Sequence, residues 1–339
     1  MDIEERFNLI KRNTEEIIGE EDLKKLLASK KRPIIYWGTA PTGKPHIGYL
    51  LPALKISDFL KAGFEVKILL ADLHASLDNV PWGVVDKRYE YYKKIIPLLI
   101  KSIGADTKHL KFIQGSTMQL KPEYMYDVLR LSTQVSVHDS LKAASDVVKL
   151  TENPKVSGLI YPLMQAMDEE YLKVDCQLGG TDQRKIMVLA RENLPKLGYK
   201  ARIEIMNPIL PGLIGKKMSS SDPNSKINLT DDEEIIKKKI MGAECSPGNL
   251  DNGLLPFIKY VIMTIKKDKK EKFLVKREEK FGGDVSYENY EDLEKDFLEQ
   301  KLHPLDLKNA LSEEIINLLK PIQREKKKFE KIEKEAYSN

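Results

Sequence analysis

A turn-rich loop between an apolar strand and an amphipathic helix constrains the fold of this chain more than any other feature. Residues 36–49 read Tyr-Trp-Gly-Thr-Ala-Pro-Thr-Gly-Lys-Pro-His-Ile-Gly-Tyr; a strand is expected over residues 33–37 and a helix from about His46. A loop that opens a helix exposes backbone N–H groups and the positive end of the helix dipole, so it suits a phosphate chain. An ordinary turn is the alternative, because glycine and proline favour turns.

A second short segment, far downstream, complements the first. Residues 216–221 read Lys-Lys-Met-Ser-Ser-Ser, which combines two positive charges with small polar side chains. Such a segment is usually a solvated loop when it stands alone. As a partner of the first segment, it predicts a cationic loop that closes over bound phosphates.

Helix and strand patterns alternate in the first half of the chain, which predicts the α/β class with a parallel sheet. The expected strands are residues 33–37, 65–71, 111–114 and 174–178. Ligands bind at the carboxyl ends of strands in open α/β sheets. Gly38, Asp72 and Gly179 stand at three of these ends, so their segments are expected to meet in one crevice.

The second half of the chain has a different pattern. Beyond Thr230 it is helical and rich in lysine, and the length of 339 residues suggests two domains. We therefore expect one domain over residues 1–229 and a second, helical domain over residues 230–339. The helices expected in it are residues 231–241, 255–266, 287–299, 304–319 and 321–337.

The composition excludes several classes of protein. No long apolar run and no charged-then-apolar leader occur, so neither a membrane span nor a signal peptide is expected. The two cysteines, Cys176 and Cys245, form no CxxC pair, so we expect no zinc site and no disulfide framework, which fits a reducing cytosol. A net charge of +4 does not identify a nucleic-acid binder, and lysine clusters such as residues 266–272 are typical of solvated helix faces as well as of phosphate-binding surfaces.

Together, the two short segments resemble the HIGH and KMSKS signatures of class I aminoacyl-tRNA synthetases. Residues 46–49 stand where that family has His-Ile-Gly-His, and residues 217–221 stand where it has Lys-Met-Ser-Lys-Ser. Tyr49 and Ser220 depart from the pattern, so the roles of the second His and the second Lys are not carried over. The resemblance covers nearly the whole chain and is strongest to tyrosyl-tRNA synthetases of the archaeal and eukaryotic cytosolic type. Further matching segments are residues 71–75, 161–165 with Asp168, 179–185 and 303–309.

The resemblance implies a fold and an activity. The fold would be a Rossmann-like parallel-sheet catalytic domain followed by a smaller all-helical anticodon-binding domain. The activity would be the activation of L-tyrosine with ATP, with release of pyrophosphate, and transfer of tyrosine to the 3′ end of tRNA(Tyr) in the cytoplasm. Mg²⁺ would be carried on the ATP phosphates, with no metal held by the protein. Residues 127–142, within an expected dimerisation segment of about residues 115–150, resemble the segment that pairs two subunits, which implies a homodimer.

Amino-acid activation needs positioned groups that stabilise charge on phosphate oxygens. By resemblance, His46 and Thr42 contact the triphosphate and Lys217 steadies the leaving pyrophosphate. A packing role for His46 at the helix start and a turn-shaping role for Thr42 are the alternatives. Asp182 is expected to accept hydrogen bonds from the ribose hydroxyls, although a turn-capping Asp is possible there. The expected nucleotide-binding residues are Gly38, Gly48, Gly180, Asp182, Met218, Ser219, Ser220 and Ser221.

A phenol offers one hydrogen-bond donor and one acceptor, so a pocket that selects it needs both. Tyr36 and Asp168 match the family positions that bind the tyrosine hydroxyl, and they supply a donor and an acceptor. For a single residue, a buried core tyrosine or an exposed helix face would be the ordinary interpretation. By resemblance, Tyr161, Gln165 and Gln183 hold the α-amino group. The expected pocket walls are Leu69, His74 and Gln119.

Three further residues are expected to contact tRNA. Arg184 and Lys185 match positions near the acceptor end, but a structural salt bridge is an almost equal alternative. Asp306 matches the family's anticodon-reading carboxylate, which accepts from a guanine edge. Because a helix is expected to begin at Pro304, a helix N-cap is the alternative for Asp306.

Two other functions remain open at this stage. One is that of a tryptophanyl-tRNA synthetase, but an indole offers only a donor, so the pair Tyr36 and Asp168 argues against it. The other is a catalytically idle paralogue that binds RNA or regulates. Retention of His46, Lys217 and Asp182 argues against that function.

Overall fold

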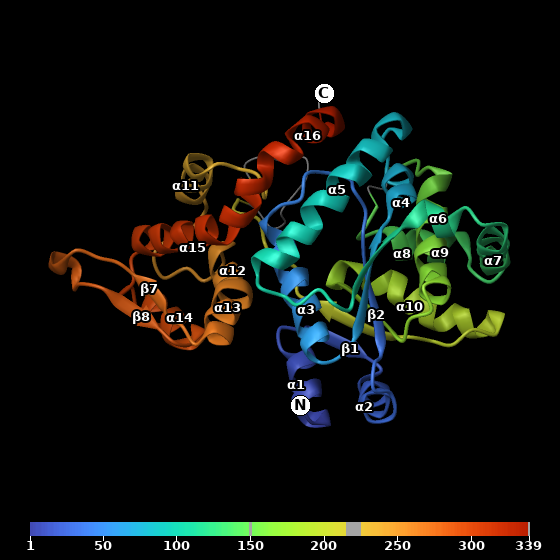
Figure 1. Ribbon diagram of the computed structural model, residues 1–339, viewed down its shortest axis with the longest axis horizontal. Helices are drawn as coiled ribbons and strands as arrows, with labels where there is room; N and C mark the ends of the chain where they lie inside the picture. The colour runs from blue at the N-terminus through green and yellow to red at the C-terminus, as the bar shows by residue number, and fades with distance from the viewer. Residues whose placement is uncertain (149–150, 215–224, 338–339) are drawn as a thin grey trace.

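The computed structural model describes residues 1–148, 151–214 and 225–337. At its centre is a six-stranded sheet in the order β1-β6-β5-β2-β3-β4 (Figure 1). Neighbouring strands are parallel except at one edge, where β1 runs antiparallel to β6. The strands are β1 (Glu16–Ile18), β2 (Ile34–Thr39), β3 (Glu65–Leu70), β4 (Leu110–Gln114), β5 (Cys176–Gly180) and β6 (Ile203–Asn207).

Two layers of helices cover this sheet, because successive side chains of a strand point to opposite faces. Ile35 and Trp37 of β2 pack with α1, α3 and α5, whereas Tyr36 packs with α7, α9 and α10. The helices of this part of the chain are α1 (Ile3–Lys11), α2 (Glu20–Ser29), α3 (Leu50–Lys61), α4 (Asp72–Leu77), α5 (Trp82–Ser102), α6 (Gly115–Gln119), α7 (Pro122–Ser132), α8 (Val137–Ala144), α9 (Val156–Tyr171) and α10 (Arg184–Asn193).

The four predicted strands are confirmed, but the sequence did not predict two others. β1 is only three residues long and lies in a segment that reads as charged and helical. β6 is fully buried and carries Glu204 as its second residue, so it lacks a plain apolar pattern. Between β4 and β5, α7 and α8 are separate helices, because Ser136 begins α8: its hydroxyl accepts from the Asp139 N–H at 3.1 Å.

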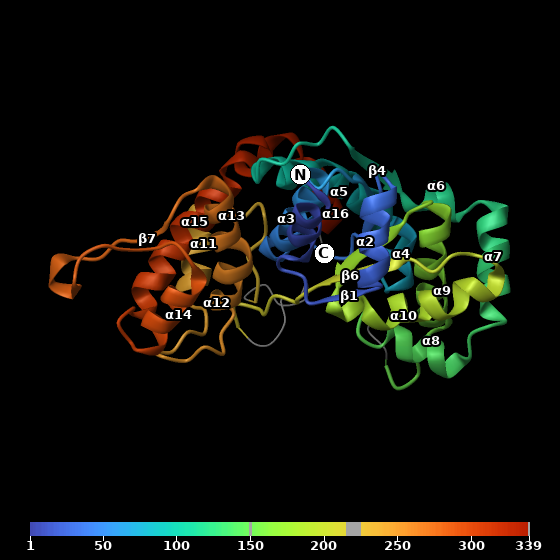
Figure 2. The same cartoon turned by 90° about the horizontal axis from the view of Figure 1, so that it is seen from below.

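The C-terminal region is mainly helical, as predicted, with one addition. Residues Phe273–Val275 (β7) and Val285–Tyr287 (β8) form a two-stranded antiparallel sheet. Gly282 and Gly283, both with positive φ, reverse the chain between them. This hairpin forms an arm that projects from the body of the protein (Figures 1 and 2). The helices are α11 (Glu233–Met241), α12 (Leu254–Phe257), α13 (Met263–Lys269), α14 (Tyr290–Leu298), α15 (Pro304–Glu325) and α16 (Glu330–Tyr337).

A predicted helix start at Pro321 is wrong, because α15 runs through this proline to Glu325. Leu318, Leu319 and Ile322 around it are buried, and their packing keeps the helix continuous. The apolar core is also continuous across the expected domain boundary at residues 229 and 230. One cluster of buried side chains joins strands β2 and β3 to helices α11 and α15.

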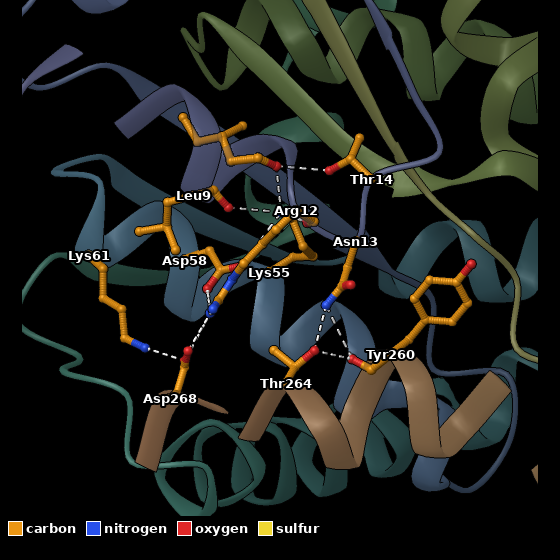
Figure 3. A network of polar contacts seen from close by, with 11 residues as sticks. Leu9, Arg12, Asn13, Thr14, Lys55, Asp58, Lys61, Tyr260, Thr264 and Asp268 are labelled. Carbon is orange, nitrogen blue, oxygen red and sulfur yellow. Dashed lines mark hydrogen bonds and ion pairs between the residues drawn. The ribbon is translucent and has the colours of Figure 1, made fainter. Parts of the chain in front are cut away.

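A polar cluster beside this core ties α1, α3 and α13 together (Figure 3). Lys55 of α3 is fully buried and donates to the carbonyls of Ile10 (2.5 Å) and Arg12 (2.7 Å) at the end of α1. It also pairs with the buried Asp58 at 3.5 Å. The Arg12 guanidinium bonds to Asp58 on one side and to Asp268 of α13 on the other, at 2.6 Å. The cluster thus replaces the water that these charges lose on burial.

Burial lowers the pKa of Lys55 to about 8, and the charge of Asp58 acts in the opposite direction. Replacing Lys55 with Met should lower the free energy of unfolding by about 3 kcal/mol, because Asp58 and the α1 carbonyls lose a buried partner. Urea denaturation measures this loss. Lys87→Met is the matched control, since Lys87 pairs with Glu335 at the surface and the loss of this exposed pair should hardly change the stability. Equal losses in the two variants would contradict the prediction.

Candidate active site

A cavity of about 370 Å³ opens at the carboxyl ends of β2, β3 and β5. In the sheet, β3 and β4 follow on one side of β2, and β5 and β6 lie on its other side. The strand order therefore reverses at β2, next to the cavity. The expected convergence of three strand ends on one crevice is therefore found. The predicted residues that line the cavity are Tyr36, Gly38, Thr42, His46, Gly48, Leu69, His74, Tyr161, Gln165, Asp168, Gly180, Asp182 and Gln183.

Other predicted residues do not line this cavity. Gln119 lies behind it and donates to the Asp168 carboxylate at 2.8 Å. Lys217, Met218, Ser219, Ser220 and Ser221 lie outside the described residues.

The two groups expected to bind a phenol are fully buried at one end of the cavity. The Tyr36 hydroxyl donates to the Gln165 carbonyl at 3.5 Å, which is a weak hydrogen bond. One oxygen of Asp168 accepts from Gln119 and from the Tyr124 hydroxyl, each at 2.8 Å. Burial raises the pKa of Asp168 to about 7, although these two hydrogen bonds act to lower it. Asp168 is thus a positioned carboxylate that titrates close to neutral pH.

Sequence reasoning missed several residues of this site. Tyr124 lies on a helix that the pattern predicts, but nothing in the pattern distinguishes its contact with Asp168 from core packing. Gln177 lines the cavity and pairs in register with Tyr36 of the neighbouring strand, so the two share a face. In the sequence, the signal for this role was that Gln177 is a polar residue between the apolar residues Cys176 and Leu178. Asp78 and Asn207 also line the cavity.

His46 stands where the loop enters the helix and is placed by two contacts. Its Nδ1 accepts from the Gly48 N–H at 3.2 Å, and its backbone pairs with Asn228. Burial, followed by the charge of Lys226, lowers the pKa of His46 to about 4, so the ring is neutral at pH 7. Because Nδ1 accepts, the proton is on Nε2, which leaves a neutral donor for an anionic ligand.

Tyr49, which departs from the family signature, has a defined place beside His46. Its ring meets the rings of His46 and Trp37 edge-on, with centroids 5.3 Å and 5.9 Å away. Its hydroxyl lies 3.2 Å from the Thr39 hydroxyl and 3.1 Å from the Tyr92 hydroxyl. The tyrosine thus packs edge-on against the His46 ring, and its hydroxyl is fixed by Thr39 and Tyr92.

The end of β5 favours glycine, because side chains crowd it. A Cβ at Gly180 would come within 2.5 Å of the Asp182 carboxylate, and one at Gly179 within 2.7 Å of the Met187 methyl group. The chain therefore turns closely around Asp182, which faces the cavity. Nearby, the Gln165 amide donates to Gln183 at 3.1 Å, so two of the predicted side chains hold each other at the rim.

The residues expected to contact tRNA lie away from the cavity. Arg184 makes two hydrogen bonds to Glu16, at 2.6 and 2.9 Å, and Lys185 pairs with Asp146 at 2.8 Å. The salt bridges considered for these residues are therefore present. The N-cap of α15 is His303, whose Nδ1 accepts from the Leu305 N–H at 3.1 Å.

Asp306 lies in the first turn of α15 and is half-buried, and the capping role considered for it belongs to His303. Residues 1–148, 151–214 and 225–337 contain no group of three or more His, Cys, Asp or Glu side chains that could hold a metal. Among the same residues, no helix is long and apolar enough to cross a membrane.

Comparisons with known proteins agree with the predicted resemblance. The family model described as tRNA synthetases class I (W and Y) matches residues 28–320. The cytoplasmic tyrosine–tRNA ligase of Gallus gallus is 52% identical over an alignment of 343 positions, which covers 99% of this chain and 64% of that protein. The Saccharomyces cerevisiae protein of the same name is 50% identical over 99% of this chain and 89% of its own length.

A solved structure shares the whole architecture. It is the tyrosyl-tRNA synthetase from Archaeoglobus fulgidus complexed with L-tyrosine, with a TM-score of 0.88 and 39% identity. The match covers 95% of this chain and 99% of that one. The chain spans slightly less than two thirds of the length of the chicken relative. It belongs to the class I aminoacyl-tRNA synthetases, in the family of the tryptophan and tyrosine enzymes, where it groups with the tyrosine enzymes of archaea and the eukaryotic cytoplasm.

Proposed function

We propose that this chain is a tyrosine–tRNA ligase that acts in the cytoplasm. It activates L-tyrosine with ATP to tyrosyl-adenylate and transfers the tyrosyl group to the 3′ end of tRNA(Tyr). The observation that carries this proposal is the buried pair of Tyr36 and Asp168 at one end of a cavity that also contains His46 and Thr42. The names of the relatives, and the tyrosine complex of the archaeal neighbour, support it.

In the tyrosine pocket, the phenol O–H donates to Asp168 and the phenol oxygen accepts from Tyr36. Gln119 and Tyr124 hold the carboxylate in place. Tyr161, Gln165 and Gln183 bind the α-amino group, and Leu69 and His74 form the walls of the pocket. Phenylalanine would fill the pocket without the hydrogen bonds that a phenol makes to Asp168 and Tyr36, so two buried polar groups would each lose the bond that a bound tyrosine supplies.

Adenylation joins a carboxylate oxygen of tyrosine to the α-phosphorus of ATP and breaks the bond to the bridging oxygen, so pyrophosphate leaves. His46 Nε2–H and the Thr42 hydroxyl donate to the phosphate oxygens as their charge grows. We assign Lys217 to the leaving pyrophosphate. Asp182 accepts from the ribose hydroxyls. Other proposed nucleotide contacts are Gly38, Gly48, Gly180, Met218, Ser219, Ser220 and Ser221, and Mg²⁺ would arrive on the ATP phosphates and neutralise part of their charge.

For tRNA, we propose that residues 1–229 hold the acceptor end and residues 230–339 hold the anticodon. Arg184 and Lys185 would exchange their present carboxylate partners for phosphates, and Asp306 would accept from an anticodon base. The arm between β7 and β8 supports an RNA partner, since Phe281 at its turn is 61% exposed and Lys280 lies 4.9 Å from its ring. Exposed aromatic rings flanked by cations are typical of surfaces on which bases stack.

We also propose that the protein is a homodimer paired through about residues 115–150. Four large apolar side chains there are each between 63% and 65% exposed: Leu120, Tyr126, Leu129 and Val137. Large apolar side chains exposed along one segment are typical of an interface, and two-fold pairing of a surface with its own copy is the commonest arrangement of a dimer.

The test of the proposed function is ATP–pyrophosphate exchange with each of the twenty amino acids. We expect tyrosine to stimulate exchange strongly, and phenylalanine and tryptophan to stimulate it hardly at all. The reason is the paired donor and acceptor at Tyr36 and Asp168. If tryptophan stimulates exchange more than tyrosine does, the chain is a tryptophanyl-tRNA synthetase instead.

The raised pKa of Asp168 predicts a pH-dependent stability for Asp168→Asn. In the unfolded chain the carboxyl has its ordinary pKa of 3.8, whereas in the fold it is about 7. The folded state therefore holds the proton more tightly, and the parent loses stability as the pH rises from about 4 to 7. Asparagine does not ionise, so the variant should gain on the order of 2 kcal/mol relative to the parent over this range.

Urea denaturation without tyrosine, at pH 4.5 to 8, measures this difference. Asp86→Asn, which replaces an exposed carboxyl in the same way, is the matched control. We expect the gain to be accompanied by loss of tyrosine-dependent exchange. A difference between Asp168→Asn and the parent that stays constant over this pH range would contradict the prediction.

For Asp306→Ala, we expect weaker charging of tRNA and nearly unchanged pyrophosphate exchange. Loss of a base acceptor should cost about 1–3 kcal/mol, by analogy with base recognition in DNA. Glu313→Ala on the same helix is the control. Both assays are run well below the melting temperature, and a parallel loss of charging and exchange would exclude a role that is specific to the anticodon.

A further inference from the structure

The loop that carries Thr42 and precedes His46 is held by the last described helix of the chain. The carbonyl of Gly43 accepts from the hydroxyl of Tyr92 at 2.7 Å and from that of Tyr337 in α16 at 3.0 Å. Next to it, the Lys44 ammonium group pairs with Glu333 of α16 at 2.8 Å. Residues almost 300 positions apart in the chain are thus in direct contact, and α16 lies beside α5 (Figure 1).

Arg88 of α5 adds two hydrogen bonds to this contact. Its guanidinium donates to the carbonyl of Thr42 and, at 3.1 Å, to the carbonyl of Ala336. The same group lies 4.9 Å from the centre of the Tyr337 ring. One cation therefore bridges the loop and the end of α16.

These contacts orient the N–H groups of the loop. Across a trans peptide the C=O and the following N–H point in opposite directions. Because the carbonyls of Thr42 and Gly43 point toward α5 and α16, the N–H groups of Gly43 and Lys44 point away from them. Neither of these N–H groups donates to a residue that the structure describes. They are the kind of donor that a loop before a helix offers to a phosphate chain.

The same stretch of chain is also held at its far end. Helix α3 continues directly from the short helical turn at Ile47–Tyr49, so His46 and α3 form one rigid unit. At its last turn, Lys61 pairs with Asp268 of α13 at 2.7 Å, and Asp58 is joined to the same aspartate through Arg12 (Figure 3). The neighbouring Asn13 amide donates to Thr264 of α13 at 2.7 Å.

We propose that the C-terminal region positions residues 42–61 for reaction with ATP by holding them at both ends. Tyr337 acts at the phosphate-binding loop and Asp268 at the end of α3, and both are positioning residues that do not touch the substrate. The inference rests on the proposed adenylation. In this proposal, the activation of tyrosine with ATP depends on helices of the C-terminal region that would otherwise only bind tRNA.

The first variant is Tyr337→Phe, assayed in the full chain. It removes one hydroxyl and keeps the ring over Arg88. We expect kcat/KM for ATP in pyrophosphate exchange to fall about 3- to 10-fold, as expected for one partly buried hydrogen bond. KM for tyrosine should not change, because Tyr36 and Asp168 lie on other elements. Tyr287→Phe is the matched control, since its hydroxyl donates to Asp296 within the C-terminal region.

The second variant is Asp268→Asn, which removes the charge shared by Arg12 and Lys61. We expect the same selective fall in kcat/KM for ATP, by about 2- to 5-fold. Glu313→Gln is its control, because this carboxylate pairs with Lys276 at the surface, away from residues 42–61.

Unchanged ATP parameters in both variants would overturn the inference, and so would equal losses for ATP and tyrosine, which indicate general destabilisation. If the parent itself shows no tyrosine-dependent exchange, the proposed function fails instead. Equilibrium dialysis with ATP alone still tests the inference in that case. Weaker ATP binding by Tyr337→Phe than by Tyr287→Phe supports it, and equal binding contradicts it.

Discussion

The burial of strand β2 on both faces is the constraint on which the rest of this structure depends. Its alternate side chains enter two separate cores, so Ile35 and Trp37 stabilise one helical layer while Tyr36 enters the other. The strand cannot slip by one residue without exchanging these sets. Its carboxyl end therefore emerges at a fixed place, with the loop that leads to His46 following directly and Tyr36 lining the cavity.

The side chains that the proposed reaction needs are buried polar groups, and their burial lowers the stability of the fold. Burial raises the pKa of Asp168 and lowers the pKa of His46, so it disfavours the charged form of each side chain. Each is kept in place by neighbours that do not react: Gln119 and Tyr124 for the carboxylate, Tyr49 for the imidazole ring. Such preorganised groups lose little on binding and favour charge where it develops.

Local patterns predicted much of this molecule, and the reasons for the remainder are physical. Apolar runs and glycine turns predicted β2, β3, β5 and the crevice at their ends, because those signals are contained within a few residues. The contact of Tyr124 with Asp168, and that of Tyr337 with Gly43, depend on how distant elements pack, which no local pattern records. The hairpin β7–β8 was missed because its two strands are only three residues long.

The placement of Trp37 gives the chain an optical property. Trp37 is buried at the cavity, in edge-on contact with Tyr49, whereas Trp82, the only other tryptophan in the sequence, is exposed at the start of α5. Fluorescence of the protein therefore comes from one buried and one solvent-exposed indole. With Trp82 replaced by phenylalanine, the fluorescence of the protein would come from a single ring beside the nucleotide loop, and its wavelength would follow the entry of water or substrate into the site.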